Sequence, residues 1–100
     1  MDRTRLTAEQ LSEAAATLHP DWHLAENALS RTVEFPTFLI AVAFIDELAP
    51  VAERLDHHPD LRLSWRCVEL TLSTHSAGGV TGYDVALASE LDPIISRLTA

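Results

Sequence analysis

The spacing of apolar residues changes along the chain, and each change predicts a different element of secondary structure. The segment Thr7–Gln10 reads TAEQ, a capping box that starts a helix, and helical spacing then continues up to Pro20. Two short stretches, Trp22–Leu24 and Ala28–Phe35, have strand character. They lie on either side of Glu26–Asn27 and are therefore predicted to form a hairpin.

The segment from Pro36, which suits the first position of a helix, returns to helical spacing and has apolar residues on two of its faces. One stripe comprises Phe38, Val42, Ile45, Ala49, Ala52 and Leu55, and the other comprises Ile40, Phe44 and Val51. A helix that is apolar on two sides must be buried on two sides. We expect the first stripe to cover a sheet and the second to pack against its own copy in a symmetric homo-oligomer. Pro50 lies inside this helix and is expected to bend it.

Between residues 61 and 74, alternation with a period of two replaces helical spacing and predicts strand, with Trp65 on the face turned away from the core. This run is long enough to divide into two strands. Ala77–Gly79 breaks the alternation, and Thr81 starts a last helix. The residues predicted to face the core are Val68, Leu70 and Leu72 of the strand and Leu87, Leu91, Ile95 and Leu98 of the helix. This order of elements predicts the α+β class, in a single domain covering residues 1–100.

The composition excludes several classes of protein. The formal net charge is −8 and the seven basic residues are scattered arginines, so a nucleic-acid surface, which needs clustered positive charge, is not expected. Cys67 is the only cysteine, which rules out an internal disulfide and a multi-cysteine zinc site. No apolar run is long enough to span a membrane and no signal peptide is evident, so we expect a cytoplasmic protein.

Three of the five histidines lie close to one predicted strand, because His57 and His58 come just before it and His75 follows at its far end. Adjacent histidines point about 100° apart on a helix, or to opposite faces of a strand, so they rarely bind one metal ion. No His-x-x-x-His pair and no Cys–His cluster is present, so we expect no metal. Nucleophilic catalysis is also disfavoured, because the chain has no Gly-x-Ser-x-Gly elbow.

Acid–base chemistry is the remaining catalytic use of these histidines. Imidazole titrates near pH ~6.5 and can both donate and accept protons at neutral pH. Glu53, one turn before His57, and Asp56 can orient or charge the rings. A simpler interpretation is that His57–Pro59 only ends a helix, because a cationic histidine suits a helix C-terminus and proline blocks continuation. Spacing alone leaves both interpretations open.

Two longer stretches carry a joint pattern, and they read ERLDHHPDL and WRCVELTLSTHSAGGVTGYDVALASELD. The pattern combines His-His-Pro, a strand ending in Thr-His, a turn of the Gly-Leu-Thr type and an Asp that opens the final helix. It resembles the pattern of the pterin-4a-carbinolamine dehydratases, and the resemblance covers roughly residues 6–98. His-His-Pro alone is a weak signal, whereas the joint pattern is specific.

The resemblance implies a four-stranded antiparallel sheet with helices packed on one face, assembled into homodimers or homotetramers. It implies dehydration of 4a-hydroxytetrahydropterin to quinonoid dihydropterin, the recycling step that follows a pterin-dependent aromatic amino acid hydroxylase. Neither a metal nor a cofactor is implied, since the pterin is the substrate. Animal members also act as dimerisation cofactors of a transcription factor, and some bacterial relatives act as enzyme assembly factors. A non-catalytic interaction module is therefore the alternative function.

The resemblance assigns catalysis to His57, His58 and His75, with His57 and His75 transferring protons and His58 binding the substrate. The residues implied to bind substrate are Glu53, Asp56, Ser73, Thr74 and Asp84, with Asp84 at the rim of the pocket. Asp84 has a second interpretation, as the N3 residue that caps the last helix. Tyr83 stands where relatives often carry Lys or Arg, so no basic group occupies that position. The three intact histidines favour an enzyme over an interaction module, which has no need of them.

Overall fold

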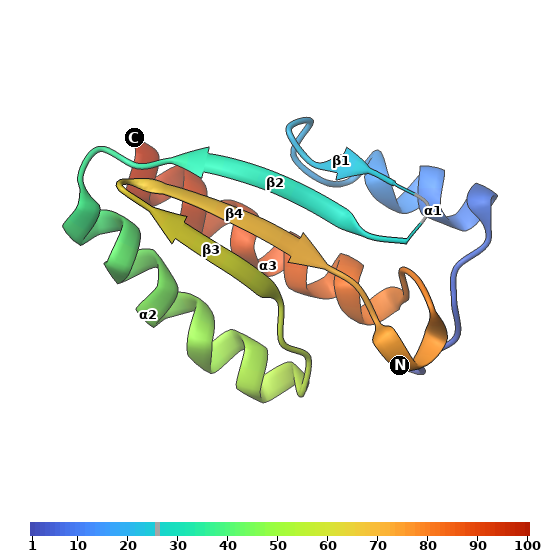
Figure 1. The fold of residues 1–100 in the computed structure, drawn as a ribbon. Helices are drawn as coiled ribbons and strands as arrows, with labels where there is room; N and C mark the ends of the chain where they lie inside the picture. The colour runs from blue at the N-terminus through green and yellow to red at the C-terminus, as the bar shows by residue number, and fades with distance from the viewer. Residues whose placement is uncertain (26) are drawn as a thin grey trace.

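Across residues 1–25 and 27–100, the computed structural model has three α-helices and one four-stranded antiparallel sheet (Figure 1). The helices are α1 (Ala8–Ala15), α2 (Phe38–Leu55) and α3 (Gly82–Thr99), and the strands are β1 (His23–Leu24), β2 (Leu29–Glu34), β3 (Asp60–Ser64) and β4 (Cys67–Leu72). A short 3-10 helix, η1 (His75–Ala77), follows β4. The strand order is β1-β2-β4-β3 with every neighbouring pair antiparallel, so the predicted α+β class and four-stranded sheet are confirmed.

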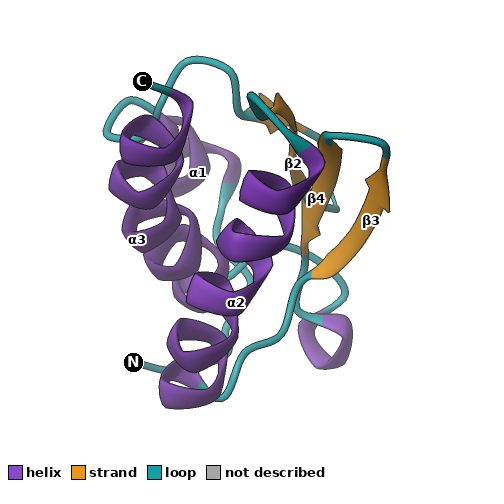
Figure 2. Ribbon diagram, turned by 90° about the vertical axis from the view of Figure 1, so that its left-hand side faces the viewer, coloured by secondary structure: helices purple, strands orange, loops and turns teal. Residues whose placement is uncertain are grey.

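The helices cover one face of the sheet and leave the other face open (Figure 2). The predicted alternation explains this arrangement, because Val68, Leu70 and Leu72 of β4 are buried while the intervening Glu69 and Thr71 are exposed. On the open face, Nη1 of Arg62 in β3 donates to Glu69 at 2.9 Å. A strand that is buried on one face alone is expected to alternate apolar and polar residues with a period of two. The sequence of β4 shows this pattern.

The long alternating run divides into β3 and β4 at Trp65, and the prediction that Trp65 lies within a strand is wrong. Its φ of 56° is in the left-handed region, so this residue turns the chain between the two strands. The side chain is exposed, and the guanidinium of Arg66 lies 4.2 Å from the centre of its ring. A turn at this position brings the two halves of the run together as a hairpin, with Leu63 opposite Val68.

The N-terminal hairpin forms as predicted, with Leu24 of β1 opposite Leu29 of β2. The predicted turn residue Glu26 lies outside the described residues. Asp92 of α3 joins this hairpin to the helical layer, because its Oδ1 accepts from Nε1 of Trp22 at 2.7 Å and from Nη1 of Arg31 at 2.9 Å. Since Trp22 and Arg31 are buried, these bonds satisfy polar groups that water does not reach.

The orientation predicted for the central helix is wrong, because its second apolar face has a partner within the chain. Phe44 was predicted to pack against a second copy of the chain. It is instead 0% exposed within the monomer and stacks on Phe35, with 5.0 Å between the ring centroids. Ile40 and Val51 are partly buried against the same core. The reason is that α2 packs on α3 as well as on the sheet. The exposed side of α2 instead carries Leu39, which is 78% exposed, and Phe38, which was predicted to cover the sheet and is 53% exposed.

Helix α2 begins at Phe38, two residues later than the predicted start at Pro36, and continues through Pro50 without a break. Thr37 is its N-cap, since Oγ1 accepts a hydrogen bond from the backbone N–H of Ile40 at 3.1 Å. The helix ends at Asp56, whose φ of 48° and ψ of 46° are left-handed. This C-cap reverses the direction of the chain just before the two adjacent histidines.

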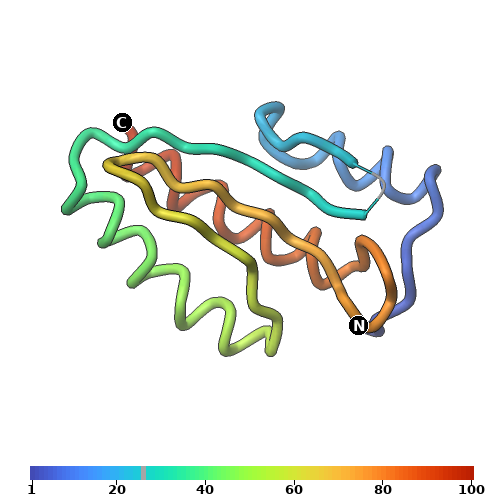
Figure 3. Tube along the Cα trace, viewed as in Figure 1, coloured from blue at the N-terminus to red at the C-terminus, as the bar shows by residue number. Residues whose placement is uncertain are grey.

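Helix α3 begins beside the N-terminal segment of the chain. Thr81 and Asp84 form its capping box, and Leu87, Leu91 and Ile95 are buried along the predicted face. Figure 3 shows the N-terminal segment running next to the loop between β4 and α3. A hydrogen bond of 2.8 Å from the backbone N–H of Leu6 to the carbonyl of Val80 fixes this contact.

We expect Phe44→Ala to lower the free energy of unfolding by about 3–5 kcal/mol, because it empties a fully packed position against Phe35. Urea denaturation followed by circular dichroism measures this change. Trp65→Ala is the control, since it removes a large but exposed aromatic side chain and should change stability by less than about 1 kcal/mol. Equal losses for the two variants would show that Phe44 does not belong to the core of the monomer.

Candidate active site

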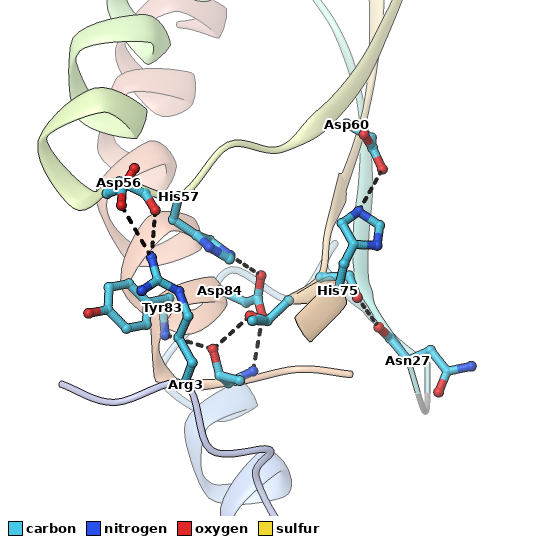
Figure 4. Close-up of polar contacts among 11 residues, drawn as sticks. Arg3, Asn27, Asp56, His57, Asp60, His75, Tyr83 and Asp84 are labelled. Atoms are coloured by element: carbon cyan, nitrogen blue, oxygen red, sulfur yellow. Dashed lines mark hydrogen bonds and ion pairs between the residues drawn. The ribbon is translucent and has the colours of Figure 1, made fainter. Parts of the chain in front are cut away.

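A cleft of about 320 Å³ lies where the end of α2, the end of β4 and the N-terminal segment meet. The residues that line it are Arg3, Asp56, His57, His58, Ser73, Thr74, His75 and Ser76. The three histidines identified in the sequence therefore share one cleft, because β3 and β4 pair antiparallel and the start of β3 lies beside the end of β4. Figure 4 shows His57 and His75 on either side of this space.

The end of α2 sends the two adjacent histidines in different directions. The left-handed Asp56 closes the helix, and the backbone N–H of His57 then donates to the carbonyl of Ala52 at 3.0 Å. His57 turns inward and is 7% exposed, whereas more than half of the His58 side chain remains in solvent. The interpretation of this motif as a helix end is therefore correct for the backbone. The same helix end also places one imidazole inside the protein.

His57 is held by a carboxylate that is completely buried. Its Nε2 lies 2.5 Å from Oδ1 of Asp84, and with Asp84 ionised, as an acceptor only, Nε2 carries the proton of this hydrogen bond. Oδ2 of Asp84 accepts from Oγ1 of Thr74 at 2.8 Å and from the backbone N–H of Thr81 at 2.9 Å. Both carboxylate oxygens are thus satisfied. Nδ1 remains as the ring nitrogen with which His57 can act on a molecule in the cleft.

The hydroxyl groups around Asp84 form a chain with a single direction. The one proton of the Thr74 hydroxyl is donated to Asp84, so the Thr81 hydroxyl, 2.8 Å away, must donate to Thr74. Oγ1 of Thr81 in turn accepts from the backbone N–H of Tyr83 at 3.3 Å, within the first turn of α3. A single network therefore starts the helix and holds the imidazole of His57.

Asp84 occupies a different place from the one expected of a substrate-binding residue at the rim. It is 0% exposed and does not line the cleft, because His57 and Thr74 lie between it and the open space. Its other interpretation, the helix cap, holds in the structure. Asp84 can influence a bound molecule only through the side chains that it positions.

His58 and His75 are held much more loosely than His57. Nε2 of His58 lies 3.6 Å from Oε1 of Glu53, and Nε2 of His75 lies 4.0 Å from Oδ2 of Asp60. All four side chains are mainly in solvent, and that of His75 is 86% exposed. Exposed ion pairs of this kind contribute about 0–1 kcal/mol, so neither ring is strongly fixed. Glu53, expected to bind substrate, contacts His58 but does not line the cleft.

The end of β4 supplies the opposite wall of the cleft. Ser73 is anchored by a hydrogen bond of 2.7 Å from its Oγ to the carbonyl of Asn27. Thr74 pairs with Gly79 across the loop that contains η1, with 2.9 Å between its backbone nitrogen and the Gly79 carbonyl oxygen. The turn closes at Gly78, whose φ of 69° suits glycine. Both residues expected from the sequence in this wall, Ser73 and Thr74, line the cleft.

Two lining residues, Arg3 and Ser76, carried no signal in the sequence. Nη2 of Arg3 donates to the carbonyl of Asp56 at 2.7 Å, and its guanidinium carbon lies 4.3 Å from the centre of the Tyr83 ring. The Tyr83 ring is also 5.7 Å from the ring of His57. Nothing near Arg3 forms a motif, because its role depends on where the N-terminal segment packs. Arg3 therefore places a basic group at the edge of the cleft beside Tyr83, whose own side chain is not basic.

Among residues 1–25 and 27–100, no group of three His, Cys, Asp or Glu side chains is arranged to hold a metal ion. Within the same residues, no helix is both long enough and apolar enough to cross a membrane.

The family described as pterin 4 alpha carbinolamine dehydratase matches residues 4–94 of this chain. A protein of Nocardia farcinica that bears the name of this dehydratase is 47% identical over 89 residues, which cover 89% of this chain and 93% of that protein. One of Mycolicibacterium smegmatis with the same name is 44% identical over 91 residues, covering 91% and 96% of the two chains. This chain therefore belongs to the pterin-4a-carbinolamine dehydratase family.

Solved structures agree with this assignment. The crystal structure of a transcriptional coactivator/pterin dehydratase from Brucella melitensis superposes with a TM-score of 0.87 at 35% identity, covering 92% of this chain and 99% of that one. A pterin dehydratase-like protein described as a RuBisCO assembly factor in the alpha-carboxysome shares the fold, with a TM-score of 0.63 at 22% identity over 77% of this chain and 92% of that one.

We expect Asp84→Ala to lower the free energy of unfolding by about 3–5 kcal/mol, because it leaves buried partners of a charged group unpaired. Asp60→Ala is the matched control, since this carboxylate is exposed and its removal should change stability by less than about 0.5 kcal/mol. Chemical denaturation measures both. An Asp84→Ala protein as stable as Asp60→Ala would show that the buried network contributes little to the fold.

Proposed function

We propose that this protein is a 4a-hydroxytetrahydrobiopterin dehydratase, which converts 4a-hydroxytetrahydropterin to quinonoid dihydropterin and water in pterin cofactor recycling. The observation that carries the proposal is the cleft itself, in which the three histidines of the family pattern meet and one of them is held by a buried carboxylate. Membership of the family supports the general activity. An aromatic amino acid hydroxylase that releases the substrate is the expected pathway partner.

The reaction needs one proton delivered and one proton removed. The bond between C4a and the hydroxyl oxygen breaks, and the oxygen takes a proton and leaves as water. The proton on N5 is lost, and its bonding electrons form the C4a=N5 double bond of the product. The pterin undergoes all of the bonding changes, so the protein's part is acid–base catalysis, for which each positioned group typically contributes ~10²–10⁴-fold.

The contrasting environments of the histidines suggest how the work is divided. His57 is suited to accept the N5 proton through Nδ1, because Asp84 stabilises the cationic ring that results. His75 lies at the open side of the cleft and is suited to protonate the departing hydroxyl. His58 takes part in binding, with Glu53 as a weak partner, while Ser73 and Asp56 offer hydrogen-bonding groups to the ring edges.

An interaction module is the alternative, and the names of two structural relatives include coactivator and assembly-factor roles. Those roles belong to surfaces rather than to a cleft. The buried His57–Asp84 pair can stabilise the fold of either kind of protein, but only an enzyme needs a ring nitrogen left free beside an open cleft. The site therefore favours catalysis as the function of this chain.

We also propose that the chain forms a homodimer or homotetramer through the exposed side of α2. Leu39 and Phe38 are large apolar residues in solvent there, and half-buried Val42 continues the same face. Contiguous apolar side chains on a helix usually mark an interface, and a two-fold axis lets one helix cover its own copy. This face replaces the Phe44 face that the sequence pattern suggested.

Replacing the cleft histidines should separate catalysis from binding. His57→Ala and His75→Ala are each expected to lower kcat about 10²–10⁴-fold, because each removes a proton-transfer group. His58→Ala should mainly raise KM. The measurement is the steady-state rate of 4a-hydroxytetrahydropterin dehydration, with circular dichroism to verify the fold.

Two further variants sharpen this test. His57→Gln retains a hydrogen-bond donor for Asp84 and should be as slow as His57→Ala while remaining better folded. His23→Ala is the matched control, since this histidine is exposed on β1 and lies outside the cleft. Normal turnover by all three cleft variants would contradict the acid–base assignment.

The assembly proposal predicts that Leu39→Glu yields a folded monomer, because a carboxylate on each helix would face its own copy in an apolar contact. Light scattering gives the mass and circular dichroism gives the fold. Ser96→Glu, at an exposed position of α3, adds the same charge and should leave the oligomer intact. A wild-type protein that is monomeric at micromolar concentration would refute the proposal.

A further inference from the structure

The N-terminal segment crosses the edge of the cleft and is seated there by several contacts. The backbone N–H of Leu6 donates to Val80 at 2.8 Å, and the Tyr83 hydroxyl donates to the Met1 carbonyl at 2.9 Å. Gly79 leaves room for the segment, since a Cβ at this position would lie 2.7 Å from Nε of Arg5. The path of the segment is thus set on both sides of Arg3, which lies between these contacts.

Arg3 points from this segment into the cleft. Its guanidinium carbon lies over the Tyr83 ring, 4.3 Å from the ring centre, and Nη2 donates to the Asp56 carbonyl at 2.7 Å (Figure 4). Its Nη2 is also 3.8 Å from Oδ2 of Asp56. The side chain is 41% exposed and an arginine has five N–H donors, so donors remain for a bound molecule.

The charge of Arg3 distinguishes it from every other residue lining the cleft. The cleft contains three histidines, whose charge depends on pH, and one carboxylate, Asp56. Arg3 is the permanent cation among the lining residues in the part of the chain that the structure describes. A guanidinium held on an aromatic ring keeps its planar set of donors in a fixed orientation, which suits a flat molecule with oxygen and nitrogen acceptors at its edge.

We propose that Arg3 is a substrate-positioning residue, whose guanidinium, held on Tyr83 and on the C-cap carbonyl of α2, donates hydrogen bonds to the carbonyl oxygen of the pterin ring. This inference rests on the proposed dehydratase function and adds a specificity contact to it. Because the carbonyl carbon is bonded to the reacting carbon C4a, a donor at this edge orients the ring between His57 and His75. Arg3 transfers no proton itself.

The test compares Arg3→Gln with Arg62→Gln, which removes the same charge from an exposed ion pair on β3 outside the cleft. We expect Arg3→Gln to raise KM for 4a-hydroxytetrahydropterin about 10-fold or more, with a smaller change in kcat, as for the loss of a charge-assisted hydrogen bond. Binding of 7,8-dihydrobiopterin, measured by fluorescence titration, should weaken by a similar factor. Arg62→Gln should match the wild type in both measurements.

Two more variants distinguish positioning from a merely structural role. Arg3→Lys keeps the charge but loses the planar donors, so its KM should fall between those of wild type and Arg3→Gln. Tyr83→Leu removes the aromatic support and should also raise KM. The KM of the double variant Arg3→Gln/Tyr83→Leu should be little higher than that of Arg3→Gln alone, because both changes disrupt the same interaction.

The outcomes separate this inference from the proposed function. An active wild type with KM and dihydrobiopterin binding unchanged within about twofold in Arg3→Gln would overturn the role of Arg3 and leave the dehydratase proposal standing. A wild type that binds dihydrobiopterin but does not dehydrate the substrate would overturn the dehydratase proposal, and the effect of Arg3→Gln on binding would still decide the role of Arg3. A wild type that binds no pterin would overturn both.

Discussion

The candidate site depends on one buried carboxylate, which needs hydrogen-bond donors from within the protein because water does not reach it. Asp84 is 0% exposed, and a buried charge without hydrogen-bond donors would cost several kcal/mol. Its donors come from three separate elements: His57 after α2, Thr74 after β4 and the backbone of Thr81 at the start of α3. Satisfying Asp84 therefore requires these three chain segments to meet at one point. The same hydrogen bonds that join these segments therefore also orient the His57 ring.

The rest of the cleft is built on the opposite principle. His75 and His58 stand in solvent beside exposed carboxylates and are held by weak pairs, so their rings can adjust to a bound molecule. Arg3 is intermediate, since it is fixed on Tyr83 and Asp56 yet reaches the cleft from a separate segment. One rigid imidazole, faced by groups that can adapt, suits a reaction in which a proton is taken at one position and delivered at another.

Local patterns in the sequence were sufficient for features that depend on neighbouring residues. The alternating face of β4 and the N-cap Thr81 follow from period and capping chemistry alone, and both are confirmed. Features decided by distant packing could not be read in this way. Phe44 is in the monomer core because α3 covers the second face of α2, and Trp65 turns the chain although the period of two continues through it. The family resemblance implied a rim position for Asp84, whereas its burial depends on the meeting of α2, β4 and α3 in the folded chain.

The central claim is that Asp84 holds His57 with Nε2 protonated and leaves Nδ1 to act on a pterin. Nitrogen-15 NMR of the histidine ring nitrogens in the wild-type protein tests this claim directly, before and after addition of 7,8-dihydrobiopterin. Neutral His57 is expected to carry its proton on Nε2, and its Nδ1 resonance is expected to shift when the pterin is added. A proton on Nδ1, or a His57 ring that does not respond to a pterin bound in the cleft, would contradict this claim.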